Sequence, residues 1–590
     1  MGSKVTLSLY APDAAGVKVR LWWDGHGEDL IDMYQVSSKF MATITLPHEP
    51  CALFYYFIVD DNGSTVYYGN NQLNLGGQGQ LSLCAPPSYQ ITVYRPTPVP
   101  EWYKNGVVYQ IFPDRFARSS DFDPAHTGTL PDVRGGVERV VETDWDKVPV
   151  NEFAPDGNIC RWRFYGGSLD GITEKLDYLE SIGVTVLYLN PVFAARSNHR
   201  YDTADYNLID PVLGDEASFV RLASEAKKHG IRLILDGVFN HCGADSRYFD
   251  YFNEFSARTG ERGARRYKTS PYRSWFDFTN TSPGYRCWWG IADLPDFNTS
   301  NPDFVEFITG KDGIVRKWLR LGASGWRLDV ADELPNDFIK AIRKAMKEED
   351  PDSLLLGEVW DDPTNKYNYG HIMEYFWGEE LDSTMNYQFR ASILNFITGE
   401  INANEFCARF MSIAENYPAE NFYGALNLLG SHDRERVLNI LGGNRMAAYG
   451  FDNGARYSDL DDEHYKLART RYKMLSVLQF CLPGVPDIYY GDEAGVMGGA
   501  DPDCRRTYPW NHADEDLVNH FKWLGSFYHE HPVLKNGDFR LTDINDDVIA
   551  LERFNDEEHF LMFINRSDRY MDIEFNGQTY NLWAYDAKII

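Results

Sequence analysis

The sequence has no apolar run of the roughly 20 residues that a membrane-spanning helix requires. Its strongly apolar windows, such as LLLGEVW at 354–360, have the length of a buried strand. Positive charge is also scarce, because 57 Lys and Arg residues stand against 87 Asp and Glu residues, for a formal net charge of −30. Such a chain repels phosphate backbones and anionic bilayers, so composition argues against a nucleic acid or a membrane as partner.

The eight cysteines include no C-x-x-C pair and no neighbouring Cys/His cluster. This pattern argues against zinc and redox chemistry, and it favours free buried thiols. Cys51 and Cys84 fall in one strand-rich segment, and whether they pair stays open. The start MGSKVTLSLYAPD lacks a basic region followed by an apolar stretch, which predicts a cytoplasmic protein. Secretion stays open if the first three residues are a cloning scar that replaced a signal peptide.

A length of 590 residues exceeds one ordinary core and predicts several domains. Residues 1–98 alternate between apolar and polar types with many aromatic rings, as an N-terminal β-sandwich does. Residues 99–510 alternate between short apolar strands and helical stretches, and residues 511–590 return to alternating strands that indicate a C-terminal β domain. About 60 residues at 241–301 exceed an ordinary loop and predict a lobe inserted after the third strand of the middle domain.

The middle domain contains eight apolar runs, each short enough for a buried parallel strand. Eight strands that alternate with helices predict an α/β fold, the (β/α)8 TIM barrel. The runs are VVYQIFP (107–113), VTVLYLNP (184–191), IRLILDGVF (231–239), SGWRLDV (324–330), LLLGEVW (354–360), LDSTMNY (381–387), LNLLGSHD (426–433) and VPDIYYGDE (485–493).

Chemistry in such a barrel gathers where the strands end, and four runs end in ionisable residues. These endings are DGVFNH (236–241), GWRLDVADE (325–333), GEVW (357–360) and GSHD (430–433). One Asp after a strand is usually a helix cap. Three carboxylates at matching positions, with two histidines and an arginine beside them, instead predict an acid/base site. Its members are Asp329, Glu358, Asp433, His241, His432 and Arg327.

The residue types suit cleavage of a bond between two sugars. Arg327 and Asp329 are two residues apart on one strand, so they share a face, and the arginine can keep Asp329 ionised as a nucleophile. Glu358, on the adjacent strand, is expected to titrate higher beside those negative charges and to arrive protonated, ready to donate to the leaving oxygen. Carboxyl groups roughly 5 Å apart would mean a covalent intermediate and a retained anomeric configuration. That step needs no metal or other cofactor.

The four endings resemble, in order and strand placement, the sequence regions of the α-amylase family, glycoside hydrolase family 13. Further matches, such as VYQIFPDRF (108–116) and PGVPDIYYGDEAG (483–495), extend the resemblance over the whole barrel. It implies that Asp329 is the nucleophile, Glu358 the general acid/base, and Asp433 a carboxylate that grips sugar hydroxyls. It also implies substrate contacts by Arg327, His241, His432, His199, Tyr201, Asp501 and Arg505.

Most aromatic rings are expected to fill the core, but three near the barrel mouth are candidates for stacking on sugars: Trp360, Phe297 and Trp288. The resemblance also implies a structural calcium ion. Family members hold one with an Asn of the third-strand region and an Asp of the LPD segment, which correspond to Asn240 and Asp296. Oxygen ligands of this kind suit calcium, and solvated loop side chains are the alternative.

The N-terminal sandwich together with the barrel resembles the neopullulanase, cyclomaltodextrinase and maltogenic amylase group. Two segments depart from it: LPDFN (294–298) stands where the group commonly has MPKLN, and VADE (330–333) where it has VANE, as in amylopullulanase-like relatives. Cleavage of α-1,4 and of α-1,6 bonds therefore both stay open. The sandwich itself has three open interpretations, namely sugar binding, formation of a homodimer, and bracing of the barrel.

The leading hypothesis is a hydrolase of maltodextrins, cyclodextrins or pullulan. A transglycosylase remains open, because water and a sugar hydroxyl compete for one intermediate. A catalytically silent sugar-binding homologue is disfavoured, since all three carboxylates are present. A glucosidase specific for α-1,6 bonds is disfavoured because the resemblance associates exo-acting forms with the lack of a large N-terminal sandwich.

Overall fold

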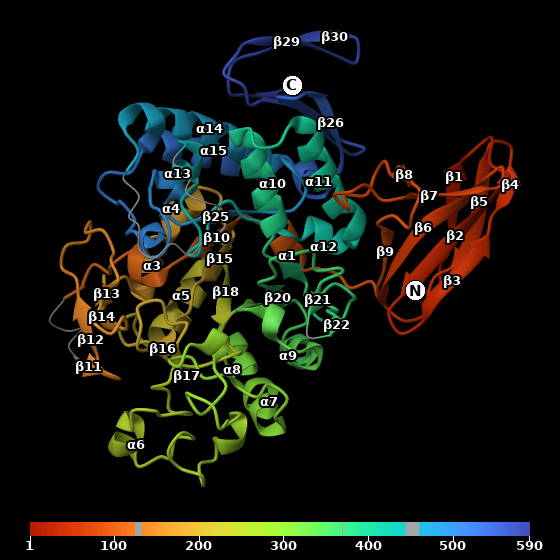
Figure 1. Cartoon of the computed structure of the whole chain (residues 1–590). Coiled ribbons are helices and arrows are strands. Elements are labelled where there is room, and N and C mark those ends of the chain that lie inside the picture. Colours follow the sequence, from red (N-terminus) through yellow and green to blue (C-terminus); the bar gives the residue numbers. More distant parts are fainter. Residues whose placement is uncertain (124–132, 369, 444–458) are drawn as a thin grey trace.

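The computed structural model describes residues 1–123, 133–368, 370–443 and 459–590. Figure 1 shows a central barrel with its helices, a β-sandwich beside it at the N-terminus, and a smaller set of strands at the C-terminus. The three parts follow one another along the chain. The catalytic chemistry is expected in the central part, so the outer parts matter here for how they contact it.

The barrel is one sheet of eight parallel strands, and each strand lies within one of the eight predicted runs. Along the sheet the order is β23, β20, β19, β18, β15, β10, β25 and β24, and a parallel bridge between Met385 and Leu426 joins its two ends. The predicted (β/α)8 fold class is confirmed. The strands are β10 (Val108–Ile111), β15 (Val186–Leu189), β18 (Arg232–Gly237), β19 (Gly325–Leu328), β20 (Leu354–Gly357), β23 (Ser383–Thr384), β24 (Leu426–Asn427) and β25 (Val485–Tyr489).

The strands are largely apolar because both of their faces are covered, with polar exceptions such as Gln110, Asp236 and Arg327. Val186 and Tyr188 of β15 point into a core shared with Leu354 and Leu356 of β20. The alternate residue of β15, Leu187, packs instead into the larger core with the surrounding helices. This period of two puts one set of side chains inside the barrel and the other under the helices.

Helices surround the barrel (Figure 1). The helix α5 begins where the Asp215 side chain accepts a hydrogen bond from Ser218 N–H, and Gly230, with φ +70°, follows its end. The helices are α1 (Glu101–Lys104), α2 (Pro113–Phe116), α3 (Leu169–Thr173), α4 (Leu176–Ser181), α5 (Glu216–Lys228), α7 (Pro302–Thr309), α8 (Ile314–Arg320), α9 (Asn336–Glu349), α10 (Tyr387–Thr398), α11 (Ala403–Asn416), α12 (Ala419–Tyr423), α13 (Val437–Leu441), α14 (Asp462–Cys481), α15 (Glu515–Glu530) and α16 (Val533–Asn536).

The predicted lobe follows β18 and is mostly irregular. It contains α6 (Glu254–Thr259) and two short 3-10 turns, η2 (Arg273–Trp275) and η3 (Trp288–Gly290). Bridges between His241 and Asp296 and between Phe276 and Phe297 tie its two ends together. Aromatic packing, rather than regular hydrogen bonding, fills its interior.

A second insertion was not predicted. It is a four-stranded sheet between β10 and α3, made of β11 (Val133–Arg134), β12 (Val137–Val141), β13 (Glu152–Phe153) and β14 (Ile159–Phe164). Strands this short give a weak alternating pattern, and the middle pair is parallel, so no turn signal marks them as a hairpin. Two further short pairs lie in barrel loops: β16 (Phe193–Ala195) with β17 (Thr203–Ile209), and β21 (Tyr367–Asn368) with β22 (His371–Ile372).

The N-terminal part is a sandwich of two sheets whose core includes Val19, Leu21, Phe40 and Phe57. One sheet contains β1 (Lys4–Tyr10), β5 (Lys39–Thr45) and β4 (Tyr34–Val36). The other contains β3 (Gly27–Asp32), β2 (Gly16–Trp23), β6 (Cys51–Asp61), β7 (Ser64–Gly69), β8 (Gln80–Ser82) and β9 (Tyr89–Val93).

The C-terminal strands form a four-stranded sheet and a hairpin. The sheet contains β26 (Asp538–Asn545), β27 (Val548–Phe554), β28 (His559–Asn565) and β31 (Asp586–Ile589), and the hairpin contains β29 (Met571–Phe575) and β30 (Gln578–Leu582). Helix α15 packs against α14 and against the turn η5 (Asp492–Ala494) that follows the last barrel strand. The domain limits near residues 98 and 510 stay predictions.

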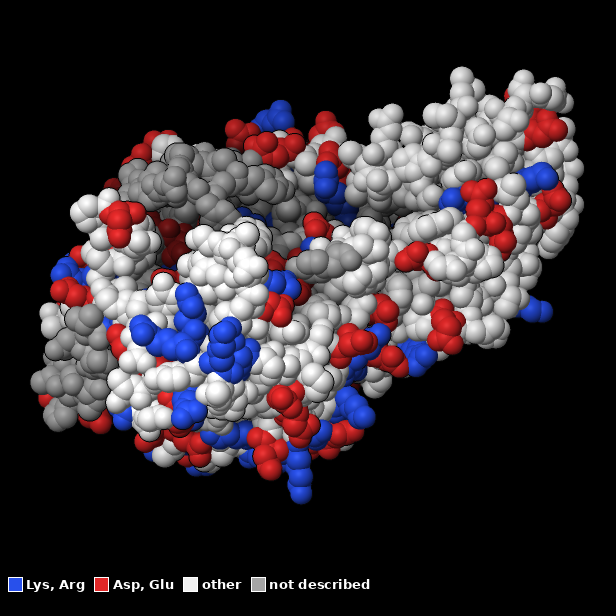
Figure 2. Space-filling view, turned by 60° about the horizontal axis from the view of Figure 1, so that its bottom comes forward, with Lys and Arg blue, Asp and Glu red and all other residues white. Residues whose placement is uncertain are grey.

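All eight cysteines are free thiols. Cys51 is buried in the sandwich while Cys84 is exposed, so these two do not pair. Within the described ranges, no helix combines the length and apolarity needed to cross a bilayer. On the described part of the face shown in Figure 2, acidic and basic side chains are interspersed. The basic side chains gather left of centre.

Candidate active site

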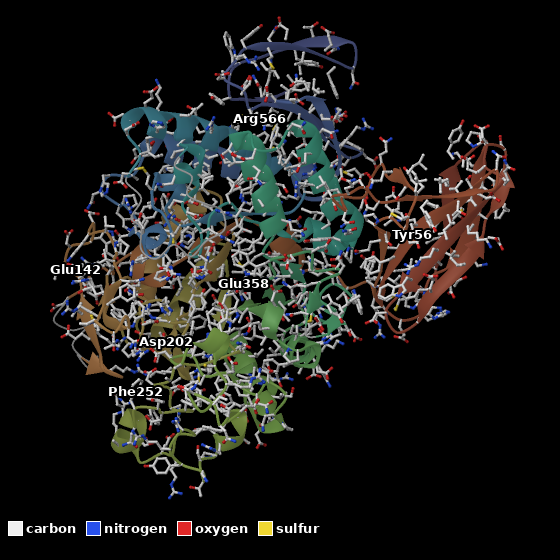
Figure 3. All side chains as sticks on the ribbon, viewed as in Figure 1. Tyr56, Glu142, Asp202, Phe252, Glu358 and Arg566 are labelled. Carbon is white, nitrogen blue, oxygen red and sulfur yellow. The ribbon has the colours of Figure 1, made fainter. Side chains whose placement is uncertain are left out.

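Two of the predicted catalytic carboxylates, and one carboxylate that was not predicted, stand at the ends of adjacent strands. Asp329 directly follows β19, Glu358 directly follows β20, and Asp236 lies near the end of β18. These three strands are neighbours in the sheet, so their carboxyl ends meet at one rim. Figure 3 labels Glu358 and shows it in the middle of the barrel, well away from Tyr56 of the sandwich and Arg566 of the C-terminal part.

One guanidinium connects the three carboxylates. Nη1 of Arg327 donates to Oδ1 of Asp236 and to Oδ1 of Asp329, both at 2.8 Å. Nη2 lies 2.8 Å from Oε2 of Glu358. The Arg327 side chain is 0% exposed, so water does not screen these contacts. Asp329 and Glu358 thus contact two nitrogens of one planar group, which keeps the two carboxyl groups close together. Closely spaced carboxyl groups, roughly 5 Å apart, are typical of a retaining pair.

Opposing effects act on the pKa of Asp329 in this cluster. Burial raises the pKa of Asp329 well above its ordinary value, the Arg327 guanidinium lowers it, and the charge of Glu358 raises it further. From the sequence, Arg327 was expected to keep Asp329 ionised. The structure instead shows three carboxylates sharing one positive charge, so Asp329 and Glu358 compete for it.

The backbone directly after Asp329 is strained. Val330 has φ 40° and ψ 47°, a left-handed conformation that β-branched residues rarely adopt. Its N–H donates to Oε2 of Glu358 at 2.9 Å. Strain of this kind, about 1–3 kcal/mol, persists where the surrounding structure imposes it, often at functional sites. Here it points a backbone donor from the Asp329 segment at the neighbouring carboxylate.

Asp433, the third predicted catalytic carboxylate, contacts a histidine and a different arginine. Its Oδ2 lies 3.0 Å from Nε2 of His432, and its Oδ1 accepts a hydrogen bond from Nη2 of Arg505 at 3.1 Å. Desolvation opposes its ionisation, but His432 and Arg505 outweigh that effect and hold the pKa of Asp433 well below its usual range. Its side chain is 35% exposed, so an ionised acceptor faces the open side of the site.

Two side-chain amides orient the His432 ring through its Nδ1 atom. The side-chain amides of Gln110 and Asn190 lie 2.9 Å and 3.1 Å from its Nδ1, and both donate to that nitrogen. With Nδ1 accepting, the proton of the neutral ring sits on Nε2, toward Asp433. The predicted residue Asp501 is adjacent, because Nη1 of Arg505 lies 2.9 Å from Oδ1 of Asp501.

The predicted stacking residue Tyr201 lies against this histidine. Its ring is nearly parallel to that of His432, with centroids 5.1 Å apart and an interplanar angle of 10°. His199 stacks beside Tyr201 at 6.0 Å. The Tyr201 hydroxyl donates to Oδ2 of Asp236 at 2.9 Å, which ties this aromatic group to the Arg327 cluster.

This arrangement can be compared with known proteins. The pattern described as "Alpha amylase, catalytic domain" matches residues 110–526, which is more than half of the chain. The chain belongs to the alpha-amylase family. An amylopullulanase from Thermoanaerobacterium saccharolyticum is 38% identical over an alignment of 540 positions, which covers 85% of this chain and 40% of that protein. The chain therefore spans less than half the length of that relative.

This chain covers a larger share of two further relatives. Neopullulanase 2 from Thermoactinomyces vulgaris is 33% identical over 521 residues, covering 87% of this chain and 77% of that one. The type III pullulan hydrolase from Thermococcus kodakarensis superposes with a TM-score of 0.70 at 27% identity, covering 99% of this chain and 96% of that one. The higher identity to the amylopullulanase agrees with the LPDFN and VADE segments, which depart from the neopullulanase pattern.

Of the remaining predicted substrate contacts of this alpha-amylase family site, His241 is buried and Trp360 lines a groove. Burial lowers the pKa of His241 to about 3, so its ring is neutral. Its Nε2 is buried and has no hydrogen-bond partner among the described residues, so it is available to a ligand. Trp360 stacks on Tyr387 at 3.9 Å and lines a groove that reaches Asn74 of the sandwich.

Phe297 does not fit its predicted role. It is buried and stacks on Phe304 at 4.2 Å inside the lobe, so it offers no face to a sugar. Sequence reasoning also missed residues that orient the site: Asp236, Tyr188, Gln110, Asn190 and Tyr387. Asp236 had a signal, since it lies in one of the four ionisable strand endings. The others were hidden within apolar runs.

The predicted calcium pair lies on two facing segments, because Phe297 N–H donates to the Asn240 carbonyl at 2.9 Å. Asp296 Oδ1 is buried and has no hydrogen-bond partner in the described part of the chain. Burial raises the pKa of Asp296 to about 7. One carboxylate and one amide fall short of the six to eight oxygens that calcium takes, so these two side chains alone do not fit the ion. Calcium binding stays a prediction.

Calcium binding at this pair, completed by oxygens that the two side chains do not supply, predicts a thermal shift. If the ion binds, adding calcium after chelation raises Tm by a few degrees, because the ligand stabilises only the folded state. Asp296→Asn removes the carboxylate and is expected to abolish the shift. Scanning calorimetry of both proteins with chelator and with calcium measures it, and equal Tm values for the unaltered chain in both conditions contradict the prediction.

Proposed function

We propose that the chain is a retaining hydrolase of α-glucans that cleaves α-1,4 glucosidic bonds in maltodextrins, cyclodextrins or pullulan; cleavage of α-1,6 bonds as well is the alternative that the product assay below decides. The single observation that carries the proposal is the contact of Asp329 and Glu358 with one guanidinium, that of Arg327. Closely spaced carboxyl groups that flank the scissile bond are the arrangement that a retaining glycosidase uses. No cofactor is required for the reaction.

The roles of the residues follow from their contacts. Asp329 attacks the anomeric carbon while Glu358 donates a proton to the glycosidic oxygen, which leaves with the released sugar. A glycosyl ester on Asp329 results. Glu358 then takes a proton from water, the water oxygen attacks the same carbon, and Asp329 is released. The ionised Asp433 accepts hydrogen bonds from hydroxyls of the bound sugar, and the neutral His241 contributes its free Nε2.

The proposed substrates rest on the comparisons and on the departures from the neopullulanase pattern. The relatives named above are an amylopullulanase, a neopullulanase and a pullulan hydrolase. Chromatography of products from pullulan, β-cyclodextrin, maltotriose and soluble starch tests the assignment. Maltotriose from pullulan together with starch cleavage would support action on both linkages, whereas panose from pullulan would restrict it to α-1,4 bonds.

The same assay addresses the transferase alternative. If sugar hydroxyls compete better than water for the glycosyl ester, maltotriose yields longer oligosaccharides rather than glucose and maltose. Absence of any product from all four substrates would refute the proposed function itself. The cytoplasmic location stays a prediction.

The contacts of the sandwich support its role as a brace for the barrel. Gln90 of β9 donates from Nε2 to Thr364 Oγ1 at 2.7 Å and accepts at Oε1 from Asn365 Nδ2 at 2.6 Å. Thr92 of the same strand donates to the Asn416 carbonyl at 2.6 Å. These bonds join the sandwich to a barrel loop and to the end of helix α11 of its own chain. A homodimer through the same sandwich remains a prediction.

Replacing Gln90 tests the brace. Gln90→Ala removes the two hydrogen bonds to the barrel loop and a third one to Thr92 of the same strand. At about 1 kcal/mol for each of the two bonds that reach the barrel, we expect a loss of at least roughly 2 kcal/mol in the free energy of unfolding. Gln78→Ala, on the exposed loop before β8, is the matched control and is expected to have no effect. Urea unfolding measures both variants, and equal midpoints would contradict the brace. Light scattering of the unaltered chain decides between a monomer and a homodimer.

A further inference from the structure

Trp289 combines two features that folding alone does not favour. Its side chain is 70% exposed, although a tryptophan usually buries most of its ring. Its backbone has φ 48° and ψ 26°, the left-handed region in which a bulky residue is strained. A strained, exposed aromatic residue at the edge of a predicted active site points to a function rather than to packing.

The indole of Trp289 is held in place. Its Nε1 donates to Oε1 of Glu333 at 2.6 Å, and Nε1 of the preceding Trp288 donates to the same oxygen at 3.2 Å. The two indoles stack with centroids 5.2 Å apart and planes 20° apart. Glu333 ends the turn η4 (Ala331–Glu333), which follows Asp329 and Val330 in the chain. One carboxylate thus fastens both lobe tryptophans to the segment that carries the predicted nucleophile.

The stack continues inward to the site. The Trp288 ring lies 5.5 Å from that of His241, with planes 29° apart. His241 is a predicted sugar contact whose Nε2 is free, so the three rings lead from the inner site to the surface of the lobe. Trp288 covers one face of the Trp289 indole, and the exposure of Trp289 leaves the other face to solvent.

We propose that Trp289 is an outer binding platform for a glucosyl unit of a long α-glucan, with Glu333 as the residue that positions it. A pyranose ring presents a flat face of C–H groups, which packs on an aromatic face. A neutral sugar also suits the surroundings, because Glu333 is acidic and the chain carries a net charge of −30. This inference rests on the proposed function. It adds a contact beyond the inner site, so it affects long substrates and spares short ones.

Substitutions at both residues test the platform. Trp289→Ala is expected to raise KM for maltoheptaose about 10-fold and to leave kcat and all constants for maltotriose unchanged. Trp289→Phe keeps the ring and is expected to recover most of the loss. Glu333→Ala is expected to give the same chain-length effect as Trp289→Ala, and Glu333→Gln, which keeps a carbonyl acceptor, to restore it. Trp583→Ala is the matched control, because Trp583 is also 70% exposed but lies in the C-terminal part.

A binding measurement separates this inference from the proposed function. Calorimetric titration of Asp329→Asn and of Asp329→Asn/Trp289→Ala with maltoheptaose and maltotriose needs no turnover. A weaker affinity of the double variant for maltoheptaose alone supports the platform. Equal affinities of the two proteins, an equal loss for both sugars, or a change in the light-scattering mass on Trp289→Ala would each overturn it. Binding without any turnover by the unaltered chain would instead count against the proposed function.

Discussion

Asp329→Asn is expected to lower the turnover of maltoheptaose by a factor on the order of 10⁴ or more, which is the scale for loss of a catalytic nucleophile. The amide has nearly the same shape and keeps an oxygen that can accept the 2.8 Å bond from Arg327. It cannot attack the anomeric carbon, because it lacks a carboxylate oxygen to form the ester. The fold is therefore expected to survive while the chemical step is lost.

Initial rates on maltoheptaose and far-ultraviolet circular dichroism of the purified variant measure these two effects. Asp337→Asn, an exposed residue in the first turn of α9, is the control and is expected to retain full activity. Turnover by Asp329→Asn within 10-fold of the unaltered chain would exclude Asp329 as the nucleophile. Mass analysis of a trapped glycosyl-peptide would then identify the carboxylate that forms the ester.

Arg327→Met is expected to abolish activity and to destabilise the fold by about 3–5 kcal/mol at neutral pH, the range for removing one partner of a buried ion pair. Three carboxylates, those of Asp236, Asp329 and Glu358, lose their shared positive charge. Burial already raises the pKa of Asp329, and Arg327 is the group that lowers it. In the variant this pKa rises further above its unfolded value.

The sign of the pH dependence follows from that shift. A carboxyl whose pKa is higher in the folded state binds more protons when folded, so the variant loses stability as pH rises from about 4 toward the raised pKa. Urea unfolding at pH 5 and pH 8 is expected to show a larger deficit at pH 8. Arg320→Met is the control, since Arg320 pairs with Glu349 at the surface and is expected to change stability by less than about 1 kcal/mol. A smaller deficit at pH 8 than at pH 5 would contradict the shared-charge interpretation.

The barrel and its three catalytic candidates could be predicted because both depend on local signals. Each barrel strand lies in a short apolar run, and four of the runs are followed directly by ionisable residues. A parallel barrel then brings the ends of its strands to one rim, so Asp329 and Glu358 become neighbours without further information. The family resemblance follows from the same endings, and the comparisons confirm the family.

The prediction from sequence was less complete for residues whose burial and contacts depend on packing between distant segments. Phe297 and Trp289 are aromatic residues of the same lobe, yet one is buried against Phe304 and the other is exposed with its indole bonded to Glu333. Sequence spacing does not distinguish them, because the lobe has no regular period from which to read an inner face. The β11–β14 sheet was missed for a related reason, since its strands are too short to show alternation.

Strand periodicity and parallel pairing are local rules, so they were enough to predict the barrel, the sandwich and the placement of Asp329, Glu358 and Asp433 after barrel strands. Three contacts became apparent only in the folded chain: Asp236 joins the Arg327 cluster, Gln110 and Asn190 orient His432, and Glu333 holds Trp289. These contacts join side chains from separate strands and loops, and their formation depends on distances and burial that appear only when the whole chain packs.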